Sequence, residues 1–156
     1  MILLTRVDHR LLHGQVAVSW VNGLHADCIF CVGDHVANSE VWKATLKLGK
    51  PEGCKLVIKD MAHAIEAINS GVTDKYKMII CVQTIAEAER LIDGCPRIKS
   101  LNLGNTKASD TTRTVSRQVF LEPYEEEILR KLIERGIEVE IRPLADDKKV
   151  LAKDVL

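Results

Sequence analysis

The stretch Arg6-Val7-Asp8-His9-Arg10-Leu11-Leu12-His13-Gly14-Gln15-Val16 interrupts an apolar run with charged residues and then becomes apolar again. Residues 1–4 before it are apolar, which predicts the start of a buried strand. Residues 15–21 show apolar side chains at helical spacing and precede Asn22-Gly23, which predicts a short amphipathic helix that stops there. The charged residues therefore form a strand-to-helix loop. In parallel α/β sheets such loops lie at the carboxyl ends of the strands, where ligands bind.

The composition of this loop favours an anion site. Two arginines and two histidines fall between Arg6 and His13, and guanidinium groups bind phosphate oxygens in pairs, whereas an imidazole can be neutral at pH 7. His13 is expected at or just before the helix start, where free backbone N–H groups and the helix dipole favour negative charge. Gly14 has no side chain and lets an anion approach the backbone. The alternative is a solvated surface loop, where arginine and histidine usually lie.

The rest of the chain alternates predicted strands with predicted helices, which indicates an α/β fold with a single doubly wound, mostly parallel sheet of about six or seven strands and helices on both faces. Residues 137–141 alternate strictly between apolar and charged, which predicts an edge strand with one face solvated or covered by a partner. The remaining strands are expected at 26–32, 55–59, 78–82, 97–104 and 116–121, and helices at 39–48, after Asp60, after Thr84, after Pro123 and in the tail 146–156.

Two further segments are expected at the carboxyl ends of the strands and are candidates for the same site. Residues 105–113 form a long loop rich in hydroxyl groups and cations after a strand, and long loops in a compact domain are often functional. Asp34 follows a buried strand, where its carboxylate could accept an imidazole N–H and fix the histidine tautomer. Asp8 could do the same, and a turn or helix-entry role for Asp34 is an equal alternative.

The composition excludes several classes of function. Lysine plus arginine and aspartate plus glutamate number 22 each, so the zero net charge gives no general attraction to nucleic acid. No apolar run is long enough for a membrane span and no signal-peptide pattern is present, which favours one cytoplasmic domain over residues 1–156. The five cysteines fall mostly in apolar runs and are expected to be reduced core residues. No cofactor, ATP or metal ion is expected, because no nucleotide loop and no cluster of metal ligands is present.

The loop motif, with Trp20 after it, resembles the signature of enzyme IIB subunits of the mannose/fructose/sorbose class of the phosphoenolpyruvate-dependent sugar phosphotransferase system. The resemblance extends through 33–37 and 102–105. It implies a protein-N(π)-phosphohistidine–sugar phosphotransferase in which the histidine before Gly-Gln-Val, here His13, carries the phosphoryl group. It also implies a phosphorylated IIA protein or domain as donor, membrane IIC and IID subunits as partners with which the chain associates peripherally, and a sugar as acceptor. Homo-oligomer formation is left open.

Roles for the other residues follow from this resemblance and from the chemistry of phosphoryl transfer. Arg10, and less directly Arg6, would bind the equatorial oxygens of the transferring group, where charge is spread in the transition state. Gly14, Thr106, Ser109 and Thr111 are candidates for neutral donors to the same oxygens. Asp8 or Asp34 would orient His13, and the resemblance implies a place for Asp34 near it.

A function of another class stays open, because a fold of this kind can also serve as a non-catalytic flavodoxin-like module that binds a phosphorylated small molecule. A cysteine-phosphorylated sugar subunit is excluded because no cysteine lies in the first strand-to-helix loop. The sugar itself cannot be deduced: mannose, sorbose, fructose and an N-acetylated hexosamine such as N-acetylgalactosamine all fit.

Overall fold

A seven-stranded sheet forms the centre of the protein, in the order β3-β2-β4-β1-β5-β8-β9. The computed structural model describes all residues from Met1 to Leu156. Six strands run parallel, and only β9 is antiparallel to its neighbour β8. The strands are β1 (Ile2–Asp8), β2 (Cys28–Val32), β3 (Lys55–Lys59), β4 (Met78–Val82), β5 (Ser100–Asn105), β8 (Glu138–Ile141) and β9 (Val150–Leu151), and a separate hairpin pairs β6 (Arg113–Thr114) with β7 (Phe120–Leu121). The predicted fold class is confirmed.

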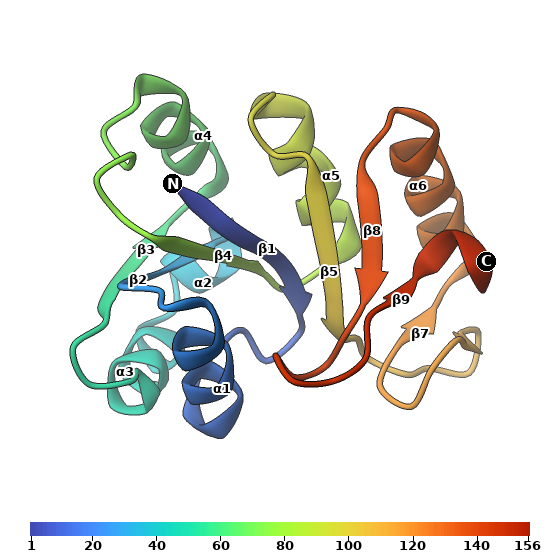
Figure 1. The fold of residues 1–156 in the computed structure, drawn as a ribbon, viewed down its shortest axis with the longest axis horizontal. Helices are drawn as coiled ribbons and strands as arrows, with labels where there is room; N and C mark the ends of the chain where they lie inside the picture. The colour runs from blue at the N-terminus through green and yellow to red at the C-terminus, as the bar shows by residue number, and fades with distance from the viewer.

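Helices cover the two faces unequally (Figure 1). Helices α4, α5 and α6 pack over one face in a core cluster that includes residues of β1, β2, β4, β5 and β8. Helices α1, α2 and α3 cover the other face only over β1, β2, β3 and β4. The helices are α1 (Gly14–Leu24), α2 (Asp34–Ala37), α3 (Glu40–Gly49), α4 (Met61–Ser70), α5 (Ile85–Gly94) and α6 (Pro123–Glu134), with a 3₁₀ turn at η1 (Ala152–Asp154). Beyond β1 the second face lacks a helix, and a hollow opens there.

Several sequence predictions are wrong in detail. Arg6 and Asp8 belong to β1, so the strand-to-helix loop is shorter than predicted. Helix α1 continues through Gly23 and ends at Leu24, and His25 after it adopts a left-handed conformation with φ 56°. Gly23 is needed for close packing, since a Cβ there would lie 2.7 Å from the Cβ of Ala145. Strand β8 is not an edge strand because β9 pairs with it, and the tail from residue 146 contributes this strand before the short 3₁₀ turn.

Strand β3 is the uncovered parallel edge of the sheet, since it pairs with β2 alone. A lysine stands at each end of it. Lys55 is exposed, donates a hydrogen bond to the Tyr76 hydroxyl at 2.7 Å, and lies 5.0 Å from the centre of that ring. The edge therefore has charged and aromatic side chains at its amino end.

A buried arginine lies where the uncovered part of the second face begins. Arg6 is 1% exposed and pairs with Asp8 at 3.0 Å. Its guanidinium also donates to the Asn102 side chain at 2.9 Å and to the carbonyl of Arg142 at 3.2 Å. These partners come from β1, from β5 and from the residue after β8, so Arg6 connects three parallel strands. Gly104 makes room for it, because a Cβ there would overlap the guanidinium.

Gly104→Ala should therefore destabilise the protein by about 1–3 kcal/mol, the usual cost of overpacking a filled interior. The guanidinium cannot move aside cheaply, since its hydrogen bonds hold it on several sides. Urea unfolding measures the change. Ser100→Ala, at an exposed position of the same strand, is the control and should stay within about 0.5 kcal/mol of the parent.

Candidate functional site

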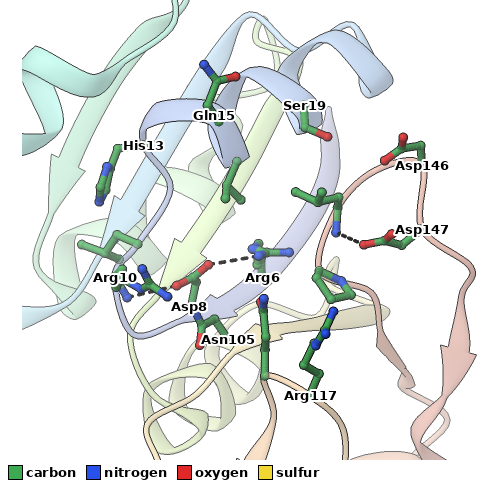
Figure 2. A pocket seen from close by; sticks show the side chains of 15 residues that line it. Arg6, Asp8, Arg10, His13, Gln15, Ser19, Asn105, Arg117, Asp146 and Asp147 are labelled. Carbon is green, nitrogen blue, oxygen red and sulfur yellow. Dashed lines mark hydrogen bonds and ion pairs between the residues drawn. The ribbon is translucent and has the colours of Figure 1, made fainter.

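His13 is half-buried on the rim of a hollow of about 830 Å³ at the carboxyl ends of β1 and β5 (Figure 2). Helix α1 forms one wall with Gln15 and Ser19, and the segment after β8 continues this wall, since the backbone N–H of Ala145 donates to the Ser19 hydroxyl at 3.3 Å. The hollow is lined by Arg6, Asp8, Arg10, Leu11, His13, Gln15, Val16, Ser19, Asn105, Arg117, Gln118, Pro143, Leu144, Asp146 and Asp147. Its opening leaves room for a group to reach the His13 ring from outside.

The loop between β1 and α1 is held by the carboxylate of Asp8. One oxygen accepts from Arg6, and the other accepts from the backbone N–H of Arg10 at 3.0 Å. The backbone N–H of Leu11 donates to the carbonyl of Asp8 at 2.8 Å. Leu11 adopts a left-handed conformation with φ 60°, which is costly for a branched residue, and its 2% exposed side chain is buried in the core under α1. The loop is therefore tightly specified from Asp8 to Leu12.

His13 is the residue that precedes the first turn of α1, and this helix has no side-chain cap. The backbone N–H groups of Gly14, Gln15 and Val16 have no acceptor in the chain. In contrast, Ser39, Asp60 and Thr84 cap α3, α4 and α5. No acidic residue lies in the first turn of α1. Free donors and the positive end of the helix dipole thus lie beside the imidazole.

Two arginine side chains border the hollow without an ion pair. Arg10 and Arg117 are exposed, and neither guanidinium has a carboxylate or other acceptor in the chain. Figure 2 shows Arg10 beside His13 and Arg117 pointing toward the Arg6–Asp8 pair from the other side. Arg6 itself is already paired with Asp8. The unpaired positive charge at this site therefore comes from Arg10 and Arg117.

The two carboxylates considered as partners of His13 are both used elsewhere. Asp8 holds Arg6 and the loop backbone, and no hydrogen bond joins it to the His13 ring. Asp34 is the first residue of α2; it accepts from the backbone N–H of Met61 at 3.0 Å and lies 3.9 Å from Arg90. It does not line the hollow of His13. The contacts of Asp34 are therefore those of a residue at a helix start, which is the alternative role given to it above.

The loop 105–113 divides between two hollows. Asn105 lines the hollow of His13, whereas Thr106 and Ser109 line a neighbouring one that also holds His9 and His35. The Thr106 hydroxyl exchanges two hydrogen bonds of 2.7 Å with the backbone of Phe120. The Ser109 and Thr111 hydroxyls both donate to Glu122, at 2.8 and 2.6 Å. The structure therefore does not bring these three hydroxyls to His13, and their role toward phosphate stays a prediction.

Arg117 and Gly49 were missed at the sequence level. Arg117 falls within residues 116–121, predicted as a strand; the short strand covers only Phe120–Leu121, and Arg117 lies in the turn before it. Its approach to β1 depends on a hairpin more than 100 residues away in the chain, which periodicity cannot reveal. Gly49 ends α3 as predicted, but its contact with His13 could not be foreseen.

The five cysteines are free and buried. Cys28 and Cys31 belong to core clusters on opposite faces of the sheet, as strand geometry requires of residues three apart. Burial raises the pKa of the Cys31 thiol to about 12 and that of Cys28 to about 11. Thiols of this kind are poor nucleophiles at neutral pH, and no cysteine lines the hollow of His13.

The whole chain from residue 2 to residue 156 matches the family model described as "PTS system sorbose subfamily IIB component". The chain belongs to this family. It is 31% identical to the mannose-specific EIIAB component of Escherichia coli strain K12 over 156 residues, all of this chain and 48% of that protein. It is 29% identical to the N-acetylgalactosamine-specific phosphotransferase enzyme IIB component 1 of the same strain, covering 95% of this chain and 94% of that one.

The crystal structure of the IIBSor domain of the sorbose permease from Klebsiella pneumoniae superimposes with a TM-score of 0.92 at 25% identity, covering 99% of this chain and 94% of that one. The family predicted from the loop motif is thus confirmed, together with its place in the sugar phosphotransferase system. The IIB chain spans about half the length of the mannose-specific relatives it matches. None of its helices has the length and apolar composition needed to cross a lipid bilayer.

The different roles of the two carboxylates can be tested by stability. Asp8→Ala should destabilise the protein by about 3–5 kcal/mol, because it leaves the Arg6 guanidinium buried without a counter-charge. Asp34→Ala should cost only about 0.5–2 kcal/mol, the range for losing a helix-capping carboxylate. Urea unfolding of the two variants gives both values. Equal losses would contradict the assignment of Asp8 as the structural support of the loop.

Proposed function

We propose that residues 1–156 act as one IIB domain that accepts a phosphoryl group on His13 from a phosphorylated IIA protein or domain and passes it to a sugar held by membrane IIC and IID subunits. The observation that supports this most is the position of His13 on an open rim, between the uncapped start of α1 and the unpaired Arg10. Two different macromolecules must reach the ring in turn, and a rim allows this.

The chemistry needs one nitrogen lone pair and a stabilised phosphoryl group. A His13 ring nitrogen attacks phosphorus, the new N–P bond forms as the donor N–P bond breaks, and the donor imidazole recovers its electron pair. The second step forms an O–P bond to a sugar hydroxyl while the N–P bond of His13 breaks, and the released imidazole nitrogen regains the electron pair that can take up the hydroxyl proton. Arg10 and Arg117 neutralise the charge on the equatorial oxygens, and the free N–H groups of Gly14 and Gln15 donate to them.

The other predicted site residues have different roles in this proposal. Arg6 and Asp8 form the floor of the hollow and hold Arg10 beside His13 through the backbone. Thr106, Ser109 and Thr111 do not line the hollow of His13, so donating to the phosphoryl oxygens requires a change in the loop 105–113. The transported sugar is left open between mannose, sorbose, fructose and N-acetylgalactosamine, because the relatives' names differ on this point.

His13→Ala should abolish phosphate acceptance from a phosphorylated IIA donor while leaving the fold intact, because no other imidazole lines the hollow. His9→Ala is the matched control and should accept phosphate normally, since its side chain lines the neighbouring hollow. Radiolabel incorporation measures both, and the bound phosphate should be labile in acid and stable in base. A wild-type chain that acquires no covalent phosphate would favour the module that only binds a phosphorylated small molecule.

Arg10→Lys should slow transfer by about tenfold to a hundredfold, since lysine keeps the charge but loses the fork that grips two oxygens. Single-turnover transfer at saturating donor measures the rate, and the concentration dependence should show little change in donor binding. Arg97→Lys, which pairs with Asp74 away from the hollow, is the control. A rate equal to that of the wild type would remove Arg10 from the mechanism.

A further inference from the structure

The carboxyl end of α3 packs directly against His13. A Cβ on Gly49, the last residue of this helix, would lie 2.8 Å from the Cβ of His13, 3.5 Å from its Cγ and 3.4 Å from the backbone nitrogen of Gly14. Ordinary van der Waals contacts begin at about 3.4 Å. The backbone of one helix end therefore lies against the side chain that starts the next helix, with no room for a methyl group between them.

No hydrogen bond or ion pair holds the imidazole. The ring makes no hydrogen bond, and neither carboxylate near the rim pairs with it. The backbone of His13 is extended, with φ −152° and ψ 170°, and this does not set the direction of the side chain by itself. The contact with Gly49 limits where the Cβ and Cγ of His13 can lie.

The backbone of Gly49 does not itself require glycine. Unlike Gly14 and Gly71, which adopt left-handed conformations with φ 62° and 84°, Gly49 has a conformation open to other residues. Alanine in a helix is favoured over glycine by about 1 kcal/mol. Gly49 therefore lowers the stability of its own helix, and its missing side chain allows the close contact with His13.

We infer that Gly49 is a positioning residue, whose missing side chain forms the seat that directs the His13 imidazole toward Arg10 and the hollow. This inference rests on the proposed role of His13. A methyl group at residue 49 would push the two helix ends apart by at least half an ångström. Since misplacing a reacting group by about 1 Å can cost on the order of 10²-fold in rate, a displacement of this size should be visible in transfer.

The test compares Gly49→Ala with Gly94→Ala. Gly94 is the last residue of α5, also has no left-handed conformation, and its Cβ would lie 2.7 Å from the Cδ1 of Ile65, far from His13. Gly49→Ala should slow single-turnover phosphoryl acceptance by about tenfold or more at saturating phosphorylated IIA, with donor binding changed less than about twofold. It should also shift the His13 ring resonances in NMR spectra of the unphosphorylated protein. Gly94→Ala should leave both unchanged at a similar loss of stability.

The outcomes separate the inference from the proposed function. If the wild-type chain takes no phosphate on His13, the relay is wrong. If the Gly49→Ala variant is phosphorylated at the normal rate and its His13 ring resonances are unshifted, only the positioning role of Gly49 is wrong. Equal slowing of phosphoryl acceptance by Gly94→Ala would show that the loss of stability causes the effect, and would likewise contradict the positioning role of Gly49. Should Gly49→Ala not fold, the nuclear Overhauser contact between Gly49 Hα and His13 Hβ in the wild-type protein decides: its presence supports the seat and its absence refutes it.

Discussion

The geometry of the rim depends on the buried ion pair between Arg6 and Asp8. A guanidinium this deep in the protein is tolerated only with a close counter-charge and further hydrogen bonds, and Asn102 and the carbonyl of Arg142 supply the latter. Asp8 uses its second oxygen to hold the backbone of Arg10. The same carboxylate thus ties the sheet to the loop. From there the buried Leu11 and Leu12 lead directly to His13, so the backbone position of His13 depends on this pair in the central strand β1.

Local sequence was sufficient where local physics decides the structure. Strands β3 and β4 lie where their apolar runs predict, and Asp60 and Thr84 cap their helices through short hydrogen bonds to residues three positions later. The loop motif placed His13 at the start of α1 for the same reason. The predictions that were wrong depend on contacts between distant residues. Strand β9 pairs with β8, and Gly23 lies inside α1 where it packs closely on Ala145. A pattern of adjacent residues contains no information on such contacts.

The candidate site shows the same division. The sequence could predict that Arg10 and His13 share a loop, because only two residues separate them. It could not predict that Arg6 is buried and paired, since an arginine in a charged loop is normally exposed. Nor could it predict that Arg117, from the β6–β7 hairpin, lines the hollow, or that the hydroxyls of Ser109 and Thr111 donate to the Glu122 carboxylate. Each of these arrangements is decided by tertiary contacts between elements remote in sequence.

The two edges of the sheet are finished in different ways, and this bears on how the protein avoids aggregation. On one side the short antiparallel β9 occupies the hydrogen-bonding groups of β8. On the other side β3 presents unpaired backbone groups, a template on which a foreign strand can add. The lysines at its two ends make such an addition costly, because a second copy aligned on this edge would bring like charges together and would have to displace Lys55 from the Tyr76 hydroxyl. The edge is thereby protected by charge, and replacing both lysines with apolar residues would turn it into a site for uncontrolled self-association.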